Sequence, residues 1–150
     1  MSSSALALLL TAPAAVHAVA PQSQSAETDV RAALLEMHAA AANLDADRFM
    51  AWYWNSPSLV ITFDDQTMQG WQDILSQQQE WWSDKSSGVQ YAEERPAMVM
   101  VQSADVVTTV QWMALKDRQG AVLTRLVVTS VWKKLPEGWR IVLAHETLDT

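Results

Sequence analysis

The sequence predicts a single α+β domain in which the helices come first and a mainly antiparallel sheet follows. Up to residue 82, apolar residues recur at the three- and four-residue spacing of amphipathic helices, with one short strand pair between them. From residue 89 onwards, strand-like segments alternate with turns rich in Asp, Gly and Pro. Strands that follow one another in this way favour a meander over βαβ units. The 150 residues are enough for one domain with a buried core.

Two helices are expected before residue 55. Residues 21–27 are polar and lack periodicity, which indicates a tether, and Ser25 or Thr28 can cap the helix that follows. Asn43 to Asp45 breaks this helix, and Asp45 can cap a second, short helix that reaches Trp54. The apolar stripe of the first helix comprises Val30, Ala33, Leu34, Met37, Ala41 and Leu44.

A short strand pair and a third helix come next. Residues 59–63 are expected to form a strand that returns through residues 67–69, and Gly70 precedes the helix. Gln78 is the one polar residue in the apolar stripe of this helix, which makes it a candidate for orienting a ligand. The stripe comprises Trp71, Ile74, Leu75, Gln78 and Trp82.

The rest of the chain is expected to be sheet. Its segments are residues 89–101, interrupted near Pro96, then 106–116, 121–134 and 139–148. In the closing segment, strict alternation predicts that Trp139, Ile141, Leu143 and His145 share one face. The three apolar side chains indicate that this face is buried, so His145 is expected to place a polar group in an apolar cavity.

The composition of the chain argues against some classes of binding partner. The net charge is −7, and the ten Lys and Arg residues are scattered, which argues against binding to nucleic acid or to anionic membranes. The chain has eight Trp residues but only two Phe residues. Because an indole N–H needs a hydrogen-bond partner, this bias suits cavity walls and interfaces, although any single Trp can also belong to the core.

The first 20 residues differ from the rest. A short apolar run followed by small residues, with possible cleavage after Ala18 or Ala20, is typical of a signal peptide, although no Lys or Arg precedes the run. The alternative is an N-terminal tail without a targeting role. Without cysteine, the chain can form neither a lipoprotein anchor nor a disulfide. We therefore expect an exported protein, periplasmic or secreted, with no membrane anchor.

Five segments resemble the nuclear transport factor 2-like superfamily, also called SnoaL-like or ketosteroid isomerase-like. They are Asn43-Leu44-Asp45-Ala46-Asp47, the strand 58–63, Met68-Gln69-Gly70-Trp71, Thr129-Ser130-Val131-Trp132, and Gly138-Trp139-Arg140-Ile141 leading to His145-Glu146-Thr147. The resemblance covers residues 28–148 and implies a cone-shaped roll, in which three N-terminal helices pack on a strongly curved sheet. It specifies no activity, because this fold hosts isomerases, hydrolases, cyclases, dehydratases and inert scaffolds.

Two activities of the superfamily do not match these residues. Ketosteroid isomerases need a carboxylate base near the first strand and an oxyanion hole with a tyrosine on the first helix, but alanines occupy 39–42 and the base position falls near Phe63. Limonene epoxide hydrolase-like chemistry needs two aspartates with an arginine between them. Asp64 and Asp105, the candidates here, are more readily explained as turn formers.

His145 and Asp64 are the candidate catalytic residues. The ordinary pKa of histidine, near 6.5, suits proton transfer at neutral pH, and a nearby carboxylate would tune it. The alternative for His145 is a structural role, hydrogen-bonded to a helix-end carbonyl or a threonine at the rim of the cone. A lone histidine is weak evidence for a metal site, so neither metal nor cofactor is expected.

Further side chains are candidate ligand contacts. Arg125 lies in an otherwise apolar row and must be paired, exposed or directed at a ligand. The alternative for the aromatic members is the core or a dimer surface on the sheet. The candidates are Tyr53, Trp54, Trp71, Gln78, Trp82, Met98, Trp112, Arg125 and Trp132.

Three functions remain open. The first is an exported module that binds a small apolar or aromatic molecule between helices and sheet. The second is a small cofactor-free enzyme, an isomerase, cyclase or dehydratase, that uses His145 with an acidic partner. The third is a homodimeric scaffold paired through the sheet. A cavity that contains an acidic side chain would favour the enzyme, and a filled cone would favour the scaffold.

Overall fold

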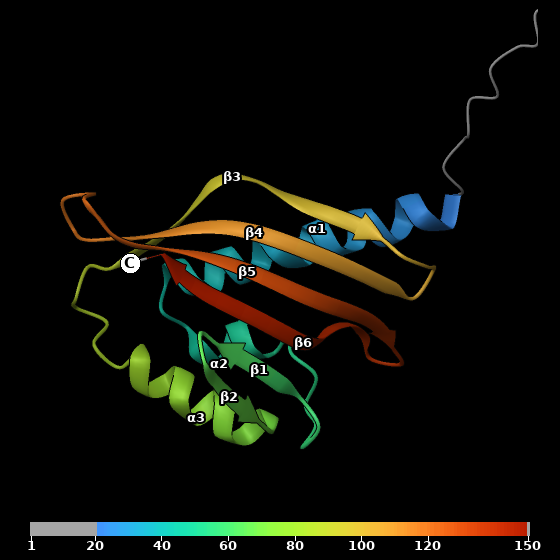
Figure 1. Ribbon diagram of the computed structural model, residues 1–150, viewed down its shortest axis with the longest axis horizontal. Coiled ribbons are helices and arrows are strands. Elements are labelled where there is room, and N and C mark those ends of the chain that lie inside the picture. The colour runs from blue at the N-terminus through green and yellow to red at the C-terminus, as the bar shows by residue number, and fades with distance from the viewer. Residues whose placement is uncertain (1–20, 150) are drawn as a thin grey trace, which may run out of the picture.

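The computed structural model describes residues 21–149, which form three helices and one six-stranded sheet (Figure 1). The helices are α1 (Pro21–Ala42), α2 (Ala46–Met50) and α3 (Trp71–Trp81). The strands are β1 (Val60–Phe63), β2 (Gln66–Gln69), β3 (Gln90–Val101), β4 (Val106–Lys116), β5 (Val122–Leu135) and β6 (Gly138–Asp149).

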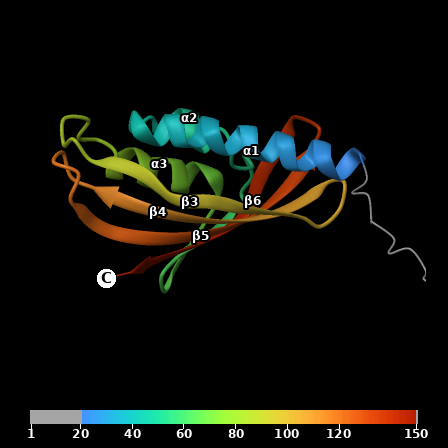
Figure 2. The same cartoon turned by 90° about the horizontal axis from the view of Figure 1, so that it is seen from above.

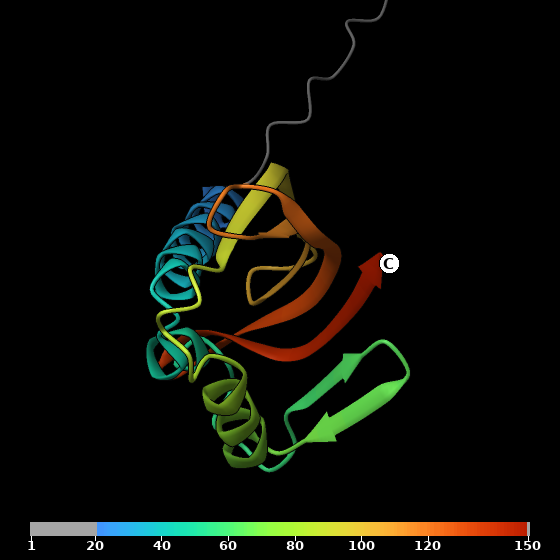
Figure 3. The ribbon, with the colours of Figure 1, turned by 90° about the vertical axis from the view of Figure 1, so that its left-hand side faces the viewer.

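The sheet has the order β2-β1-β6-β5-β4-β3. All neighbours are antiparallel except β1 and β6, which pair in parallel. The last strand of the chain therefore lies inside the sheet, between the N-terminal hairpin and the meander. The strands curve strongly, and all three helices lie on the concave side (Figures 2 and 3). This arrangement is the expected α+β roll.

Helix α1 begins earlier than the sequence predicted. Residues 21–27 are helical rather than a tether, and Thr28 donates a hydrogen bond to the Gln24 carbonyl inside the helix instead of capping it. Proline is favourable in the first turn, and no helix breaker follows it. Ala26 is buried in the core, so packing also stabilises this extension. Residues 1–20, with the expected signal peptide, lie outside the described part of the chain.

The predicted starts of the second and third helices are confirmed, but the second helix ends at Met50 and not at Trp54 as predicted. The Asp45 side chain accepts a hydrogen bond from the Arg48 amide and so caps α2. Gly70 precedes α3 with a φ of 92°, a conformation that costs glycine little. The break near Pro96 is a pair of register shifts between β3 and β4, because proline cannot donate to a ladder.

A buried cluster between α1 and the sheet fills one end of the cone. Trp132 is fully buried there, and its indole N–H donates to the Thr109 hydroxyl at 3.0 Å. Val107 and Ile141 are also fully buried in this cluster. The packed end holds the helix against the sheet, which fixes the geometry of the open end.

A β-bulge in β6 changes which side chains face the helices. Trp132 pairs with Ile141 whereas Val131 pairs with Leu143, so Val142 is one residue too many for β5. An extra residue reverses the alternation beyond it. Trp139 and Ile141 point inward, but Leu143 is 45% exposed and His145 is exposed. The prediction that these four residues share one face is therefore wrong.

The Trp132–Thr109 bond provides a test of the packed end. Thr109→Val keeps the side-chain shape but leaves a buried indole N–H without an acceptor, which should lower the free energy of unfolding by about 1–3 kcal/mol in urea denaturation. Thr108→Val makes the same change on the opposite face of β4, where the side chain is half-buried, and should change stability by less than about 0.5 kcal/mol. Equal losses in the two variants would contradict this account.

Candidate active site

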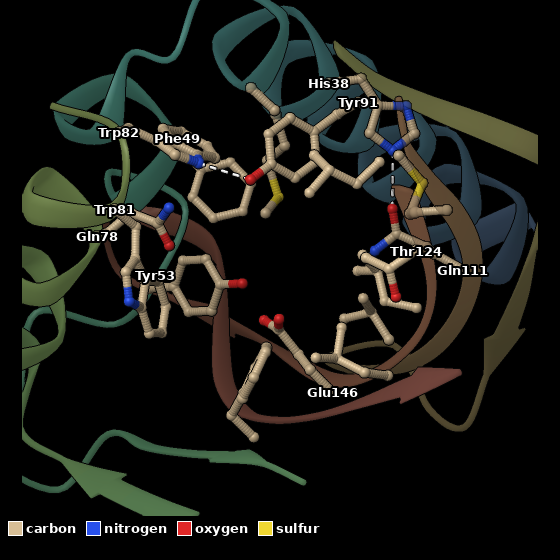
Figure 4. A pocket seen from close by; sticks show the side chains of 18 residues that line it. His38, Phe49, Tyr53, Gln78, Trp81, Trp82, Tyr91, Gln111, Thr124 and Glu146 are labelled. Carbon is tan, nitrogen blue, oxygen red and sulfur yellow. Dashed lines mark hydrogen bonds between the residues drawn. The ribbon is translucent and has the colours of Figure 1, made fainter. Parts of the chain in front are cut away.

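The open end of the cone contains a cavity of about 350 Å³ between the helices and the concave face of the sheet (Figure 4). Most of its wall is apolar or aromatic, and its polar groups come from seven elements or adjoining segments. It is lined by Met37, His38, Ala41, Phe49, Tyr53, Phe63, Gln78, Trp81, Trp82, Tyr91, Gln111, Met113, Leu115, Thr124, Leu126, Val128, Glu146 and Leu148.

Glu146 provides the one carboxyl group in this lining. It lies on β6 beside Val128 of β5 and Phe63 of β1, and its side chain points into the cavity (Figure 4). Removal from bulk water among apolar walls raises its pKa from 4.5 to about 7. A carboxyl group with this pKa is present in both protonation states near neutral pH.

Asp64 fixes the end of β6 against β1. Its amide donates to the Glu146 carbonyl at 2.9 Å, and its carboxylate accepts a hydrogen bond from the Leu148 amide at 2.9 Å. The residue has a φ of 50°, which Asp tolerates better than most residues. Asp64 therefore holds the backbone on both sides of the cavity carboxyl, but its own side chain does not line the cavity.

Tyr53 faces Glu146 from the segment after α2. The residue is 2% exposed, and its backbone bridges to Ile141 beside the bulge. Its hydroxyl points toward the Glu146 carboxylate (Figure 4). Burial, and then the charge of Glu146, raise the Tyr53 pKa well above 10. The phenol consequently stays protonated at neutral pH and can donate a hydrogen bond.

Aromatic rings form the adjoining wall. Phe49 packs on Tyr53 and on Trp82, with ring centroids 5.6 and 5.1 Å apart. The Trp82 indole donates to the Tyr91 hydroxyl at 2.8 Å, which leaves the tyrosine proton free to point elsewhere. Burial raises the Tyr91 pKa, so this group also stays protonated. Such walls favour flat, apolar ligands.

A second polar pair lies away from Tyr53. Gln111 of β4 is 6% exposed, and its Oε1 atom lies 2.8 Å from Nε2 of His38 on α1. Because a carboxamide oxygen can only accept, His38 must carry the proton at Nε2. The bond joins the first helix to the sheet across the cavity wall.

Three of the predicted site residues, Tyr53, Gln78 and Trp82, line this cavity, and the others do not. Trp132 belongs to the packed end, and Trp71 donates its indole N–H to the Met50 carbonyl. Both contacts satisfy an indole inside the core.

Most of the remaining predicted site residues lie on the outer face of the sheet. Trp112 and Gln111 are neighbours on β4 and face opposite sides of the sheet. Gln111 faces the cavity, while Arg95 stacks on the Trp112 ring at 3.5 Å. Arg125 pairs with Glu94 at 2.9 Å. Met98 is half exposed, and Trp54 lies in a shallow groove beside Leu143.

His145 lies outside the cavity as a consequence of the bulge. It is exposed, and its Nε2 atom lies 3.4 Å from the Thr147 hydroxyl, a threonine contact of the kind expected for a structural role. The adjacent Glu146 takes the inward position. Sequence alternation without the bulge selects the wrong one of these two neighbours.

The sequence analysis missed the polar groups that matter most in the cavity. Glu146 was hidden by the bulge, and Tyr91 alternates with Glu93, so no apolar row marked its face. Gln111 could have been found, because the alternation in β4 already set it on the face opposite Trp112 together with Met113. A polar residue in an otherwise apolar row, as at Gln78, was the available signal.

Within residues 21–149, no group of three or more His, Cys, Asp or Glu side chains is arranged to hold a metal ion. No helix in that range has the length and hydropathy needed to cross a membrane.

Comparison with solved structures identifies the same architecture in other proteins, two of which are described as being of unknown function. An NTF2-like protein from Pseudomonas putida KT2440 superposes with a TM-score of 0.73 at 12% identity, covering 83% of this chain and 87% of that one. An NTF2-like protein from Shewanella oneidensis MR-1 gives 0.68 at 21% identity, covering 80% and 97%. An NTF2-like protein with a cystatin-like fold from Novosphingobium aromaticivorans gives 0.71 at 16%, covering 83% and 82%.

These likenesses show the fold alone. No curated protein matches the sequence. The family model described as the SnoaL-like domain, however, matches residues 30–147, which is most of the chain and includes every residue that lines the cavity except Leu148. The chain therefore belongs to the SnoaL-like domain family.

Proposed function

We propose that the cavity binds a small apolar or aromatic molecule and that Glu146 makes the domain a cofactor-free proton-transfer enzyme, of the isomerase or dehydratase type. The observation that carries this proposal is the single carboxyl group among apolar walls, with a pKa of about 7. A general acid or base works best when its pKa lies near the working pH. Perturbed carboxyl groups in cavities are candidates for this role.

Tyr53 supports the same chemistry. If Glu146 removes a proton from the carbon next to a carbonyl group, negative charge develops on the carbonyl oxygen. The Tyr53 hydroxyl, which points into this region, can donate a hydrogen bond to that oxygen (Figure 4). The protonated Glu146 can then return the proton to another carbon, which is isomerisation. It can instead give the proton to a departing hydroxide, which leaves as water in a dehydration.

Simple ligand binding is the second candidate, because the apolar wall supports it without any reaction. The size of the cavity weighs against a scaffold with a filled cone. Pairing through the sheet remains a proposal supported by exposed Val127 and Leu143 on its outer face. Export is likewise a proposal, and it rests on the composition of residues 1–20.

A generic base-sensitive substrate tests Glu146 without knowledge of the natural one. In 5-nitrobenzisoxazole, a base removes the C3 proton while the N–O bond breaks, which gives a cyanophenolate. The rate should rise with pH to a plateau, with its inflection near pH 7, because the carboxylate is the active form. Glu146→Gln should reduce the rate by about a hundredfold or more.

Glu137→Gln is the matched control for this assay. Its carboxylate is exposed in the last hairpin, so the rate should stay unchanged. If Glu146→Gln retained the wild-type rate, Glu146 would not be the base. Binding of the compound without turnover would favour the simple binding module.

The pH dependence of stability provides a further test. The folded state binds more protons than the unfolded state between the ordinary carboxyl pKa of 4.5 and about 7. The free energy of unfolding contributed by Glu146 is therefore lost as pH rises through this window. Since glutamine does not titrate, the free energy of unfolding of Glu146→Gln relative to wild type should rise by about 3 kcal/mol between pH 4 and pH 8.

Urea denaturation of the two proteins across this range measures that difference, and Glu137→Gln should give none. A constant difference between Glu146→Gln and wild type at all pH values would show that the Glu146 pKa is not raised.

A further inference from the structure

Of the two polar ends of the buried Gln111 amide, only the oxygen has a hydrogen-bond partner among the described residues. This Oε1 atom lies 2.8 Å from Nε2 of His38, so the oxygen end of the amide faces the helix. The Nε2 atom then points toward the cavity (Figure 4). Among the described residues, no hydrogen bond is formed by this nitrogen. The two N–H groups of this amide face the cavity and are therefore available to an acceptor on a bound ligand.

The charges of the cavity restrict what that acceptor can be. Neither Lys nor Arg occurs among the described lining residues, and the one carboxyl group is Glu146. A phosphate or carboxylate ligand would therefore lose its hydration without gaining a Lys or Arg partner, and it would be repelled by ionised Glu146. An uncharged acceptor such as a ketone or ester oxygen avoids both costs.

The position of the amide indicates where this acceptor lies on the ligand. In Figure 4, Gln111 and Tyr53 lie on opposite sides of the cavity, with Glu146 between them and closer to Tyr53. The reacting part of a substrate belongs near Glu146 and Tyr53. The group that meets Gln111 is then a separate, distal one.

From these observations we propose that Gln111 is a specificity-determining residue. It selects an uncharged, flat, mainly apolar ligand that carries a hydrogen-bond acceptor at the end away from Glu146. His38 acts as a positioning residue that holds the amide with its N–H groups toward the ligand. The proposal rests on the cavity being the binding site, as proposed above, but not on any reaction there.

Two isosteric probes isolate the hydrogen bond. 2-Acetylnaphthalene carries a carbonyl oxygen where 2-isopropenylnaphthalene carries a methylene group, so their shapes match and their acceptors differ. Binding can be followed by the fluorescence of Trp81 and Trp82 in the cavity wall. The ketone should bind the wild-type protein about tenfold more tightly. The anion 2-naphthoate, tested at pH 8, should bind more weakly than either.

Gln111→Met should remove the preference for the ketone by weakening its binding, while the affinity for the hydrocarbon stays the same. Gln78→Met is the matched control, because it makes the same change in the same cavity, at a half-buried side chain that no described hydrogen bond orients. It should keep the preference. Unchanged hydrocarbon binding also reports that Gln111→Met is folded.

The outcomes separate this inference from the proposed function. Equal binding of ketone and hydrocarbon to the wild-type protein would overturn the role of Gln111 and leave the cavity as a binding site. Loss of the preference in Gln78→Met rather than in Gln111→Met would assign the acceptor to the other amide and overturn it too. Tight binding of 2-naphthoate would overturn the requirement for an uncharged ligand. Binding of none of the three probes would contradict the cavity itself as a site for aromatic molecules.

Discussion

The arrangement of the cavity depends on the extra residue at Val142 in β6. Before it, Trp139 and Ile141 pack into the closed end of the cone. After it, the alternation is reversed, and Glu146 and Leu148 face the cavity while His145 faces solvent. The first part of β6 thus contributes side chains to the packed end of the cone, and the last part contributes side chains to the cavity. Bulges next to sites commonly redirect a side chain in this way.

The pKa of the Glu146 carboxyl group is raised by burial among apolar side chains and not by a charged partner. Apolar side chains of β5 and β6 and the aromatic wall keep bulk water away from Glu146, which raises its pKa. The same burial keeps the facing tyrosines protonated. The cavity therefore contains an acid–base group and hydrogen-bond donors whose protonation states differ at neutral pH, although all are shielded by the same walls.

The sequence was sufficient for the fold but only partly for the site. Periodicity predicted the order of helices and strands, and Asp45 and Gly70 marked two helix starts correctly. The sequence did not show which aromatic residues line the cavity. Trp132 and Trp71, for example, donate their indole N–H groups to partners within the protein and do not line it. A one-residue bulge has no signature in alternation, so the inward residue of the pair His145 and Glu146 could not be identified.

The place of β6 in the sheet has a consequence for how the molecule is made. This strand is the last in the chain, yet β1 and β5 both pair with it. Until it is added, the β1–β2 hairpin has no connection to the meander, and Asp64 has no partner at Glu146 or Leu148. Such pairing between distant segments forms late and slowly. The C-terminal strand both joins the hairpin to the meander and carries the cavity carboxyl, so a chain cut short by a dozen residues would lose this junction and Glu146 together.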